Sequence, residues 1–320
     1  MTPGSHAVAT GAVDIGGTKI AVGAVDLSGK LLAREEMPTA AQDGFEAAMA
    51  RIVRMLEEVC SRARVTLQGI GIGCTGPVDP FKGEIGVVDF LPGWQGCNPV
   101  DVLSRHFKLG VAMENDADAA ALAEARWGAG HGKQSLIYVT VGTGIGGGIV
   151  LGGTLYRGAG GSHPEIGHHV IDDAGPPCFC GARGCWEVLA RGPAMVERVL
   201  RDAPSDYPHR DTLTAAQVCR LAREGDPDAQ REIVRERHFL AIGVANLATM
   251  FAPDLIVLGG GVLSSADLFL PAIREHVRRN CGLIQADCVQ VVTSLLGGDA
   301  ALLGAAVVWQ QRIGTTGQGN

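Results

Sequence analysis

Four residues near the middle of the chain have the side chains and the spacing of a zinc site. They are His168, Cys178, Cys180 and Cys185. One imidazole and three thiolates form a closed tetrahedral set, which normally holds a structural zinc ion. Prolines and glycines punctuate this stretch, so we expect a loop that a metal ion could order. From the sequence, His169 or His163 could replace His168 as the ligand.

Two glutamates bracket the same stretch. Glu165 precedes it and Glu187 follows it. A bound metal could hold both carboxylates as acceptors for sugar hydroxyls, whereas each glutamate alone would be an ordinary surface residue.

Three glycine-rich turns could bind phosphate groups. They are Gly16-Gly17-Thr18, Gly142-Thr143-Gly144 and Gly259-Gly260-Gly261. Glycine lets backbone N–H groups approach phosphate oxygens without a Cβ in the way, and the two threonine hydroxyls can donate to the same oxygens. Any one of these turns could equally be an ordinary tight turn, but the three together suit a nucleoside triphosphate.

Two known glycine motifs are not matched by these turns. There is no P-loop, and no dinucleotide-binding pattern follows the first strand. The run Gly142–Gly147 fits that pattern by its letters, but we expect it to continue into a strand rather than a helix. A Rossmann dehydrogenase is therefore excluded.

Carboxylates stand at the ends of two expected strands. Asp14 could orient Mg²⁺ or its waters, or it could bond to its own turn. Lys19 is either a solvated or a phosphate-facing cation. Asn115-Asp116 lies where α/β proteins place reactive groups, and a carboxylate there could take a proton from an alcohol that attacks a phosphoryl group. Alternatively this pair caps the following helix, a role that Asp118 fits equally well.

Hydrophobic periodicity indicates the α/β elements that would position these residues. Strands are expected at 8–15, 20–25, 31–37, 69–74, 111–113, 136–141, 145–151 and 255–258, and helices at 45–62, 100–107 and 118–127. The glycine hairpin of the N-terminus returns at 136–151. Such an internal repeat suggests two similar α/β lobes, and the cleft between them would be the natural site.

Composition narrows the class of protein further. The 320 residues are 46% hydrophobic, enough to bury a sizeable core. A formal net charge of −7 argues against broad electrostatic capture of nucleic acid or of a membrane surface. We recognise no signal peptide and no spanning segment, so a cytoplasmic protein is expected.

Taken together, the motifs resemble the ROK family of sugar kinases and sugar-responsive repressors over nearly the full chain. The matching motifs are Asp14-Ile-Gly-Gly-Thr-Lys19, Gly76-Pro-Val-Asp79, Leu91-Pro-Gly-Trp94, Glu114-Asn-Asp116, Gly142-Thr-Gly-Ile-Gly-Gly147, Glu165-Ile-Gly-His168, Cys178-x-Cys180-Gly-x-x-Gly-Cys185-x-Glu187 and Gly259-Gly-Gly-Val262. The resemblance implies a hexokinase/actin-like fold, with two ribonuclease-H-like lobes and with ATP and sugar in the cleft. The smaller lobe would span 1–117, with a helix at about 300–314 packed back on it. The larger lobe would span 118–299 and carry the zinc loop 165–187.

The resemblance also implies a role for each matching residue. Asp116 would be the general base that deprotonates the attacking sugar hydroxyl. The sugar contacts would be Gly76, Asn115, Asp116, Glu165, His168 and Glu187. ATP with its Mg²⁺ would be held by Asp14, Gly16, Gly17, Thr18, Lys19, Gly142, Thr143, Gly144, Gly260 and Gly261. Structural Zn²⁺ would be held by His168, Cys178, Cys180 and Cys185.

Family frequency places glucose first as the substrate, phosphorylated at its 6-hydroxyl, but two departures bear on this choice. Glucokinase-like members usually have Ala-Gly before the Glu165 position, whereas this chain has His163-Pro164, as some fructokinase-like members do. They also often have Asn before Leu-Pro-Gly-Trp, where this chain has Phe90 preceded by Asp89. Fructokinase, N-acetylmannosamine kinase and glucosamine kinase therefore stay open, as does polyphosphate as the phosphoryl donor.

Two rival functions belong to other classes of protein. Repressors of this family carry a DNA-binding domain of about 70–80 residues ahead of the glycine hairpin, whereas 13 residues precede Asp14 here. We therefore expect no nucleic-acid partner. A sugar-binding regulator without turnover is the second rival, against which the intact Asn115-Asp116 argues. Because dimers are common in the family, a homodimer or higher homo-oligomer is expected.

Overall fold

The structure, a computed structural model, describes residues 7–207, 210–284 and 289–313. Their contacts divide the chain into two compact units. Unit 1 contains the residues up to Gly132, the segment Leu155–His163 and the residues from Gly298 onward. Unit 2 contains Lys133–Thr154 and Pro164–Gly297. Among the described helices, none combines the length and the apolar character that crossing a membrane requires.

A mixed sheet with the strand order β3-β2-β1-β4-β7 forms the centre of unit 1. Its strands are β1 (Ala7–Ile15), β2 (Lys19–Val25), β3 (Leu31–Pro38), β4 (Val65–Cys74) and β7 (Val111–Asn115). β1 and β2 form an antiparallel hairpin, while β4 and β7 continue the sheet in parallel with β1. The carboxyl ends of β1, β4 and β7 therefore lie at one edge, where Ile15 pairs with Cys74 and Cys74 with Asn115.

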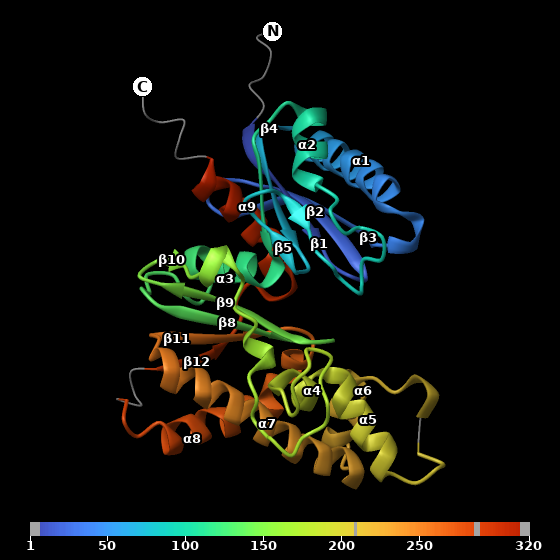
Figure 1. Cartoon of the computed structure of the whole chain (residues 1–320), viewed down its shortest axis with the longest axis vertical. Coiled ribbons are helices and arrows are strands. Elements are labelled where there is room, and N and C mark those ends of the chain that lie inside the picture. The colour runs from blue at the N-terminus through green and yellow to red at the C-terminus, as the bar shows by residue number, and fades with distance from the viewer. Residues whose placement is uncertain (1–6, 208–209, 285–288, 314–320) are drawn as a thin grey trace. The chain divides into compact units, whose positions relative to one another are not determined.

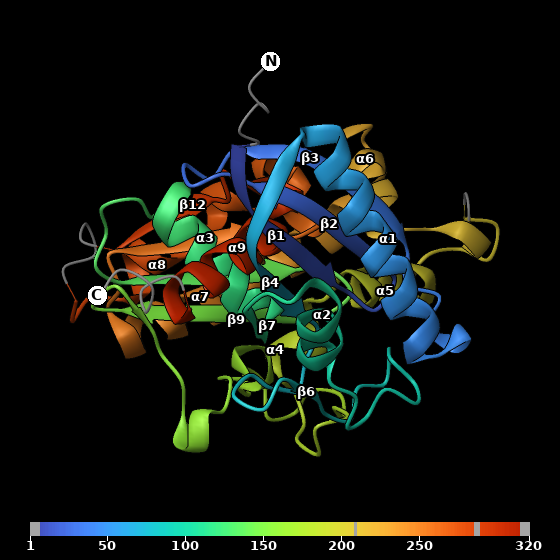
Figure 2. The ribbon, with the colours of Figure 1, turned by 90° about the horizontal axis from the view of Figure 1, so that it is seen from above.

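Helices cover both faces of this sheet (Figure 1, Figure 2). α1 (Phe45–Ala63) and α2 (Pro99–Phe107) share a core with the apolar side chains of one face, among them Ile70 and Ile72. α9 (Ala300–Arg312) packs on the other face, where a Cβ at Gly71 would lie 1.7 Å from the Ala305 carbonyl oxygen. α3 (Asp116–Trp127) packs against α9. A small hairpin joins β5 (Val78–Asp79) and β6 (Glu84–Ile85).

Unit 2 is built on a sheet with the order β10-β9-β8-β11-β12. Its strands are β8 (Leu136–Val141), β9 (Ile145–Leu151), β10 (Thr154–Leu155), β11 (Leu255–Gly259) and β12 (Gln290–Thr293). An antiparallel hairpin, β8 with β9, is again followed by parallel strands. The order of the strands along the chain is thus the same within each of these sheets, as the repeated glycine hairpin in the sequence predicts.

The helices of unit 2 surround the long helix α7 (Figure 1). They are α4 (Trp186–Ala190), α5 (Gly192–Asp202), α6 (Ala215–Arg223), α7 (Pro227–Phe251) and α8 (Leu270–Asn280). Short 3-10 turns occur at Ala41–Asp43, Ala159–Gly161, Ile166–His168, Arg210–Thr212, Val262–Leu268 and Gly297–Asp299.

The division into compact units differs from the expected division after residue 117. α3 lies in unit 1 because it packs against α9, and the segment Leu155–His163 also has its contacts there. The strand and helix ranges expected from periodicity are all present, with ends shifted by a few residues. α3 begins at Asp116 rather than at residue 118, because Asn115 caps it.

Candidate functional site

Two acidic side chains lie at the edge of the unit 1 sheet where β1, β4 and β7 end. Asp14 is the second-last residue of β1, and Asp116 follows β7 directly. Burial, together with the nearby charge of Asp116, raises the pKa of Asp14 to about 7. Burial also raises the pKa of Asp116, and this is opposed by its hydrogen bond from Ala117 and by the charge of His163. Strand register, rather than closeness in sequence, brings these carboxyl groups together.

Asn115 has a local structural role in addition to the predicted role in sugar binding. Its Oδ1 accepts hydrogen bonds from the backbone N–H groups of Ala117 at 2.9 Å and Asp118 at 3.3 Å, so Asn115 is the N-cap of α3. Asp116 Oδ1 accepts from Ala117 N–H at 2.8 Å. A Cβ at Gly76 would lie 2.8 Å from Asn115 Nδ2, so the missing side chain at Gly76 gives this amide its space. Nδ2 of Asn115 is the atom that the cap leaves to donate to a ligand.

The first glycine turn is held by its own backbone. Gly16 N–H donates to the Lys19 carbonyl at 2.9 Å, and Thr39 Oγ1 donates to the Gly16 carbonyl at 2.6 Å. Lys19 Nζ forms an exposed ion pair with Glu36 at 3.0 Å. Lys19 is therefore a solvated cation in this structure. The side chain of Thr18 is exposed, as a phosphate contact would need.

A pocket of about 750 Å³ opens in unit 2 beside the other glycine turns. Gly142, Thr143 and Gly261 line it, as expected for a nucleotide site. Its apolar wall comes from Val262, at the end of the third glycine motif, and from residues that the sequence analysis did not single out: Pro193, Val196, Leu213 and Ala215. The Gly192-Pro193 pair that starts α5 was a signal for this wall, since it lets a helix begin against the Gly142 turn through a 2.8 Å bond from Gly192 N–H to the Gly142 carbonyl.

Two more of the predicted nucleotide contacts are glycines with close neighbours, and at Gly260 the backbone itself requires glycine. Gly260 has a φ of +89°, and a Cβ there would lie 2.4 Å from the carbonyl oxygen of Val141. A Cβ at Gly144 would lie 2.5 Å from Oε2 of Glu187. These glycines shape the turn whether or not a ligand is bound.

The four predicted metal ligands converge in unit 2. The ligand atoms of His168, Cys178, Cys180 and Cys185 all lie within 4.8 Å of one another. His168 Nδ1 is 3.5 Å from the Cys178 sulfur, and the sulfurs of Cys180 and Cys185 are 3.5 Å apart. Tetrahedral zinc, with bonds of about 2.3 Å to sulfur and about 2.0 Å to nitrogen, separates two sulfurs by roughly 3.8 Å and sulfur from nitrogen by roughly 3.6 Å. The donor set and its spacing fit zinc.

The other two histidines that could serve as the ligand have other partners. His169 Nδ1 is 2.5 Å from the Ile166 carbonyl oxygen, and His163 Nδ1 is 2.8 Å from Asp118 Oδ2. The geometry therefore favours His168 as the nitrogen ligand.

Glu187 connects the metal cluster with the glycine turn of unit 2. Its Oε2 accepts a hydrogen bond from the backbone N–H of Ile145 at 2.8 Å, and its Oε1 lies 3.9 Å from His168 Nε2. Glu187 lies two residues after Cys185 in α4, so ordering of the cysteine loop fixes the start of this helix. Glu165, at the other end of the stretch, has an exposed side chain.

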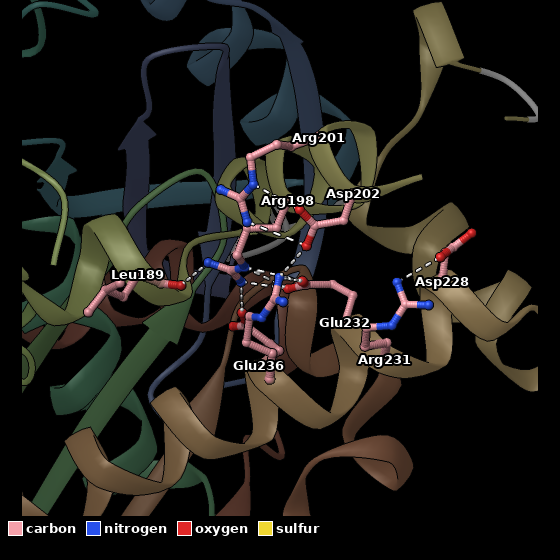
Figure 3. A network of polar contacts seen from close by, with 9 residues as sticks. Leu189, Arg198, Arg201, Asp202, Asp228, Arg231, Glu232 and Glu236 are labelled. Carbon is pink, nitrogen blue, oxygen red and sulfur yellow. Dashed lines mark hydrogen bonds and ion pairs between the residues drawn. The ribbon is translucent and has the colours of Figure 1, made fainter. Parts of the chain in front are cut away.

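A buried ion network holds α4 to its neighbours (Figure 3). Arg198 on α5 donates to the carbonyl oxygen of Leu189, and its Nη2 contacts Glu232 at 2.6 Å and Glu236 at 2.7 Å. Both glutamates lie on α7. Burial raises the pKa of Glu236 to about 8 against the opposing charge of Arg198. The sequence alone did not identify this network, because Arg198 lies 34 residues before Glu232 in the chain.

Comparison with known proteins agrees with the fold. In overall fold the chain is an α/β protein of the kind seen in ROK hexokinases: it matches the ROK hexokinase of Thermus thermophilus with a TM-score of 0.82 at 36% identity, covering 96% of this chain and 99% of that one. The model of the ROK family matches residues 10–312. The chain belongs to the ROK family, which confirms the resemblance seen in the sequence.

Two further relatives bear on activity. A glucokinase of Halalkalibacterium halodurans is 33% identical over 320 residues, covering 96% of this chain and 97% of that protein. A ROK family glucokinase of Streptomyces griseus, whose structure is a complex with glucose and AMPPNP, matches with a TM-score of 0.82 at 33% identity, covering 95% of this chain and 99% of that one.

Proposed function

We propose that this protein transfers the γ-phosphoryl group of ATP to a hexose, with glucose and its 6-hydroxyl as the expected acceptor. Full-length similarity to glucokinases supports both the reaction and the sugar. The observation that carries the mechanism is that Asp14, Asn115 and Asp116 lie at the same end of the unit 1 sheet, where β1 and β7 end on either side of β4. A catalytic carboxylate at this edge of an α/β sheet agrees with where such folds place their chemistry.

Asp116 is the proposed general base. Its Oδ1 accepts from the backbone, which leaves the other oxygen to take the proton of the attacking hydroxyl. Burial raises its pKa, which strengthens the carboxylate as a base, while the neighbouring charge of His163 acts in the opposite direction and lowers the pKa. Asn115 Nδ2, beside Gly76, would donate to the sugar.

ATP is proposed to lie against the glycine turns, with its base in the 750 Å³ pocket of unit 2. The apolar wall of Pro193, Val196 and Leu213 suits a flat heterocycle, and Gly142, Thr143, Gly144, Gly260 and Gly261 would contact the phosphates and adenosine. In unit 1, Gly16, Gly17 and Thr18 would contact the phosphates. Lys19 would act as a nearby cation.

Asp14 is the proposed residue for Mg²⁺ or its bound waters. Its carboxyl has a pKa raised to about 7 by burial and by Asp116, so a divalent cation would offset a charge repulsion that the fold builds in. When bound with ATP, Mg²⁺ supplies neutralisation of phosphate charge.

On the sugar side, Glu165, His168 and Glu187 are the proposed contacts from unit 2. Zinc held by His168 and the three cysteines would order the loop without taking part in the reaction. Nδ1 of His168, which lies beside the Cys178 sulfur, would be the atom that holds zinc, and Nε2 of the same ring lies 3.9 Å from Oε1 of Glu187.

The finer architecture belongs to the same proposal. We expect two ribonuclease-H-like lobes of the hexokinase/actin type that close on the two substrates and exclude water from the phosphoryl transfer. The proposal also includes a cytoplasmic location, where ATP is available, and a homodimer or higher homo-oligomer. Light scattering of the purified protein measures the oligomeric state directly.

Rates with a panel of sugars test the proposal. ADP formation with Mg-ATP is measured for glucose, fructose, mannose, glucosamine, N-acetylglucosamine and N-acetylmannosamine, using zinc-replete protein. We expect glucose to give the highest kcat/KM. A higher value for fructose or for an amino sugar would overturn the choice of glucose and would point to His163-Pro164 and Phe90 as the determinants. Sugar binding in calorimetry without turnover would favour a regulator.

A further inference from the structure

The segment Leu155–His163 makes ionic contacts on both sides of Asn115-Asp116, which we call the catalytic pair. By its contacts it belongs to unit 1, although residues of unit 2 flank it in sequence. Near its start Arg157 forms an ion pair with Glu114, the residue before Asn115. At its end His163 Nδ1 lies 2.8 Å from Oδ2 of Asp118, two residues after Asp116. We call Leu155–His163 the clasp.

The carboxylate of Asp118 depends on its contact with His163. The side chain of Asp118 is 1% exposed, and that of His163 is 16% exposed. Oδ1 of Asp118 is buried without a hydrogen-bond partner among the residues that the structure describes. Taking away a partner from a buried carboxylate is costly, because its charge is then left uncompensated. The contact with His163 therefore governs how the Asp118 side chain is held.

Asp118 lies in the first turn of α3, which Asp116 begins. Its backbone N–H also donates to Oδ1 of Asn115, so Asp118 is hydrogen-bonded to the N-cap residue of this helix. A change in the Asp118 side chain is thus transmitted to the turn that carries both members of the catalytic pair.

We infer that His163 is a positioning residue for the base: through the carboxylate of Asp118 it holds the first turn of α3. The inference rests on the proposed function, since it concerns the same base. It also gives the departure from the glucokinase-like Ala-Gly a mechanistic role, because alanine at position 163 could not make this contact.

Several charged or titratable groups face this turn. Asp14 on β1 and Cys74 on β4 face Asp116, and Arg312 at the end of α9 faces Asp118. His163 is the basic side chain that acts on Asp116 itself, and its charge lowers the pKa of that carboxyl. Loss of this charge raises the pKa of Asp116. The base is then lost to protonation at a higher pH than in the unmodified protein.

Two substitutions separate the contact from the charge. His163→Ala removes both, whereas the amide of His163→Gln can still donate to Asp118 without a charge. His106→Gln is the matched control, because His106 is an exposed histidine of unit 1 paired with Glu57. The readouts are kcat and KM for glucose and ATP, and the pH dependence of kcat/KM.

For His163→Ala we expect kcat at pH 7 to fall about tenfold, with KM for ATP within about twofold, and the acid limb of kcat/KM to move up by about half a pH unit. His163→Gln should recover most of kcat but keep the displaced acid limb. The control should match the unmodified protein. Unchanged kcat and an unchanged acid limb in His163→Ala overturn the inference, and recovery of the acid limb by His163→Gln overturns the role of the charge.

Limited trypsin digestion gives a readout that needs no catalysis. Cleavage after Arg157, followed by mass spectrometry, should be several-fold faster in His163→Ala than in the control, since the clasp has lost one of its two ionic contacts. Equal cleavage overturns the anchoring. If the unmodified protein phosphorylates none of the sugars, the proposed function fails, while the digestion still decides whether His163 anchors the clasp.

Discussion

Asp116 and Asp14 illustrate how backbone register sets the chemistry of single residues. Both carboxyl groups are desolvated by burial at the ends of parallel strands, and this burial raises the pKa of each. Two neighbouring carboxyl groups resist being ionised at the same time. The site therefore favours a bound cation and also provides a carboxylate that can accept a proton. In the proposed reaction these needs correspond to Mg²⁺ and to the sugar hydroxyl.

Asp116→Asn tests the base directly. The amide keeps the shape and can still accept from Ala117 N–H, but it cannot take up a proton at neutral pH. We expect kcat to fall at least about 100-fold with little change in glucose binding by calorimetry or in thermal stability. The exposed Asp101→Asn on α2 is the matched control. Turnover within a few-fold of the unmodified protein would rule out Asp116 as the base.

For single residues, the sequence predicts which residue types form the site better than it predicts which residues they contact. Carboxylates at strand ends, glycines in turns and the Cys/His set follow from local pattern. Local pattern did not show that Asn115 rather than Asp118 caps α3, because asparagine and aspartate cap helices equally well. Arg157 and Arg312, which both bind the buried Glu114, come from segments remote in sequence, so local pattern contained no signal for them.

Among the elements, the cysteine loop between His168 and Cys185 has little regular structure. Among the residues described, it contains two isolated bridges, Val170 with Cys185 and Pro177 with Arg183. The Cys/His set would therefore supply much of its order, and with it the position of Glu187 at the start of α4.

Metal analysis tests the zinc site. We expect about one zinc ion per chain in protein purified without chelators. Cys180→Ser removes the thiolate of the exposed cysteine ligand, so this variant should lose the metal and its loop should be cleaved faster by proteases. Cys97→Ser, which lies outside the cluster, should keep the metal. Zinc-free unmodified protein with a protected loop would contradict the assignment.

The α4–α5–α7 network should make stability depend on pH. The pKa of Glu236 is raised by burial from 4.5 to about 8, so its contribution to stability is full below about pH 4.5 and is lost as pH rises to about 8. Glu236→Gln cannot ionise and should lose less stability over this window, by up to about 1.4 kcal/mol per pH unit. Urea unfolding at pH 5 and pH 8 measures this, with the exposed Glu224→Gln as control. Parallel pH dependence in Glu236→Gln and the unmodified protein would show that Glu236 ionises normally.

Element boundaries show where periodicity is insufficient. β4 begins at Val65, earlier than the expected residue 69, because α1 ends at Arg64 in a left-handed conformation and the chain enters the sheet at once. The pocket wall from α5 and α6 was not expected, because it depends on how helices pack and not on the sequence of either helix.

For the whole molecule, membership in the ROK family and the shared strand order of the sheets agree with an origin in a repeated α/β unit. The repeat could be recognised from the two glycine hairpins in the sequence. The division into compact units could not, since α3 and the clasp are assigned by contacts that only the folded chain makes.

Formation of glucose 6-phosphate from glucose and Mg-ATP is the measurement that tests the central claim most directly. A dehydrogenase specific for glucose 6-phosphate reports the product and the position of phosphorylation together. The proposed function predicts steady product formation by the zinc-replete protein, with one ADP released per product and with a rate that collapses in Asp116→Asn. Absence of the product at saturating glucose and ATP, or an equal rate in Asp116→Asn, would contradict it.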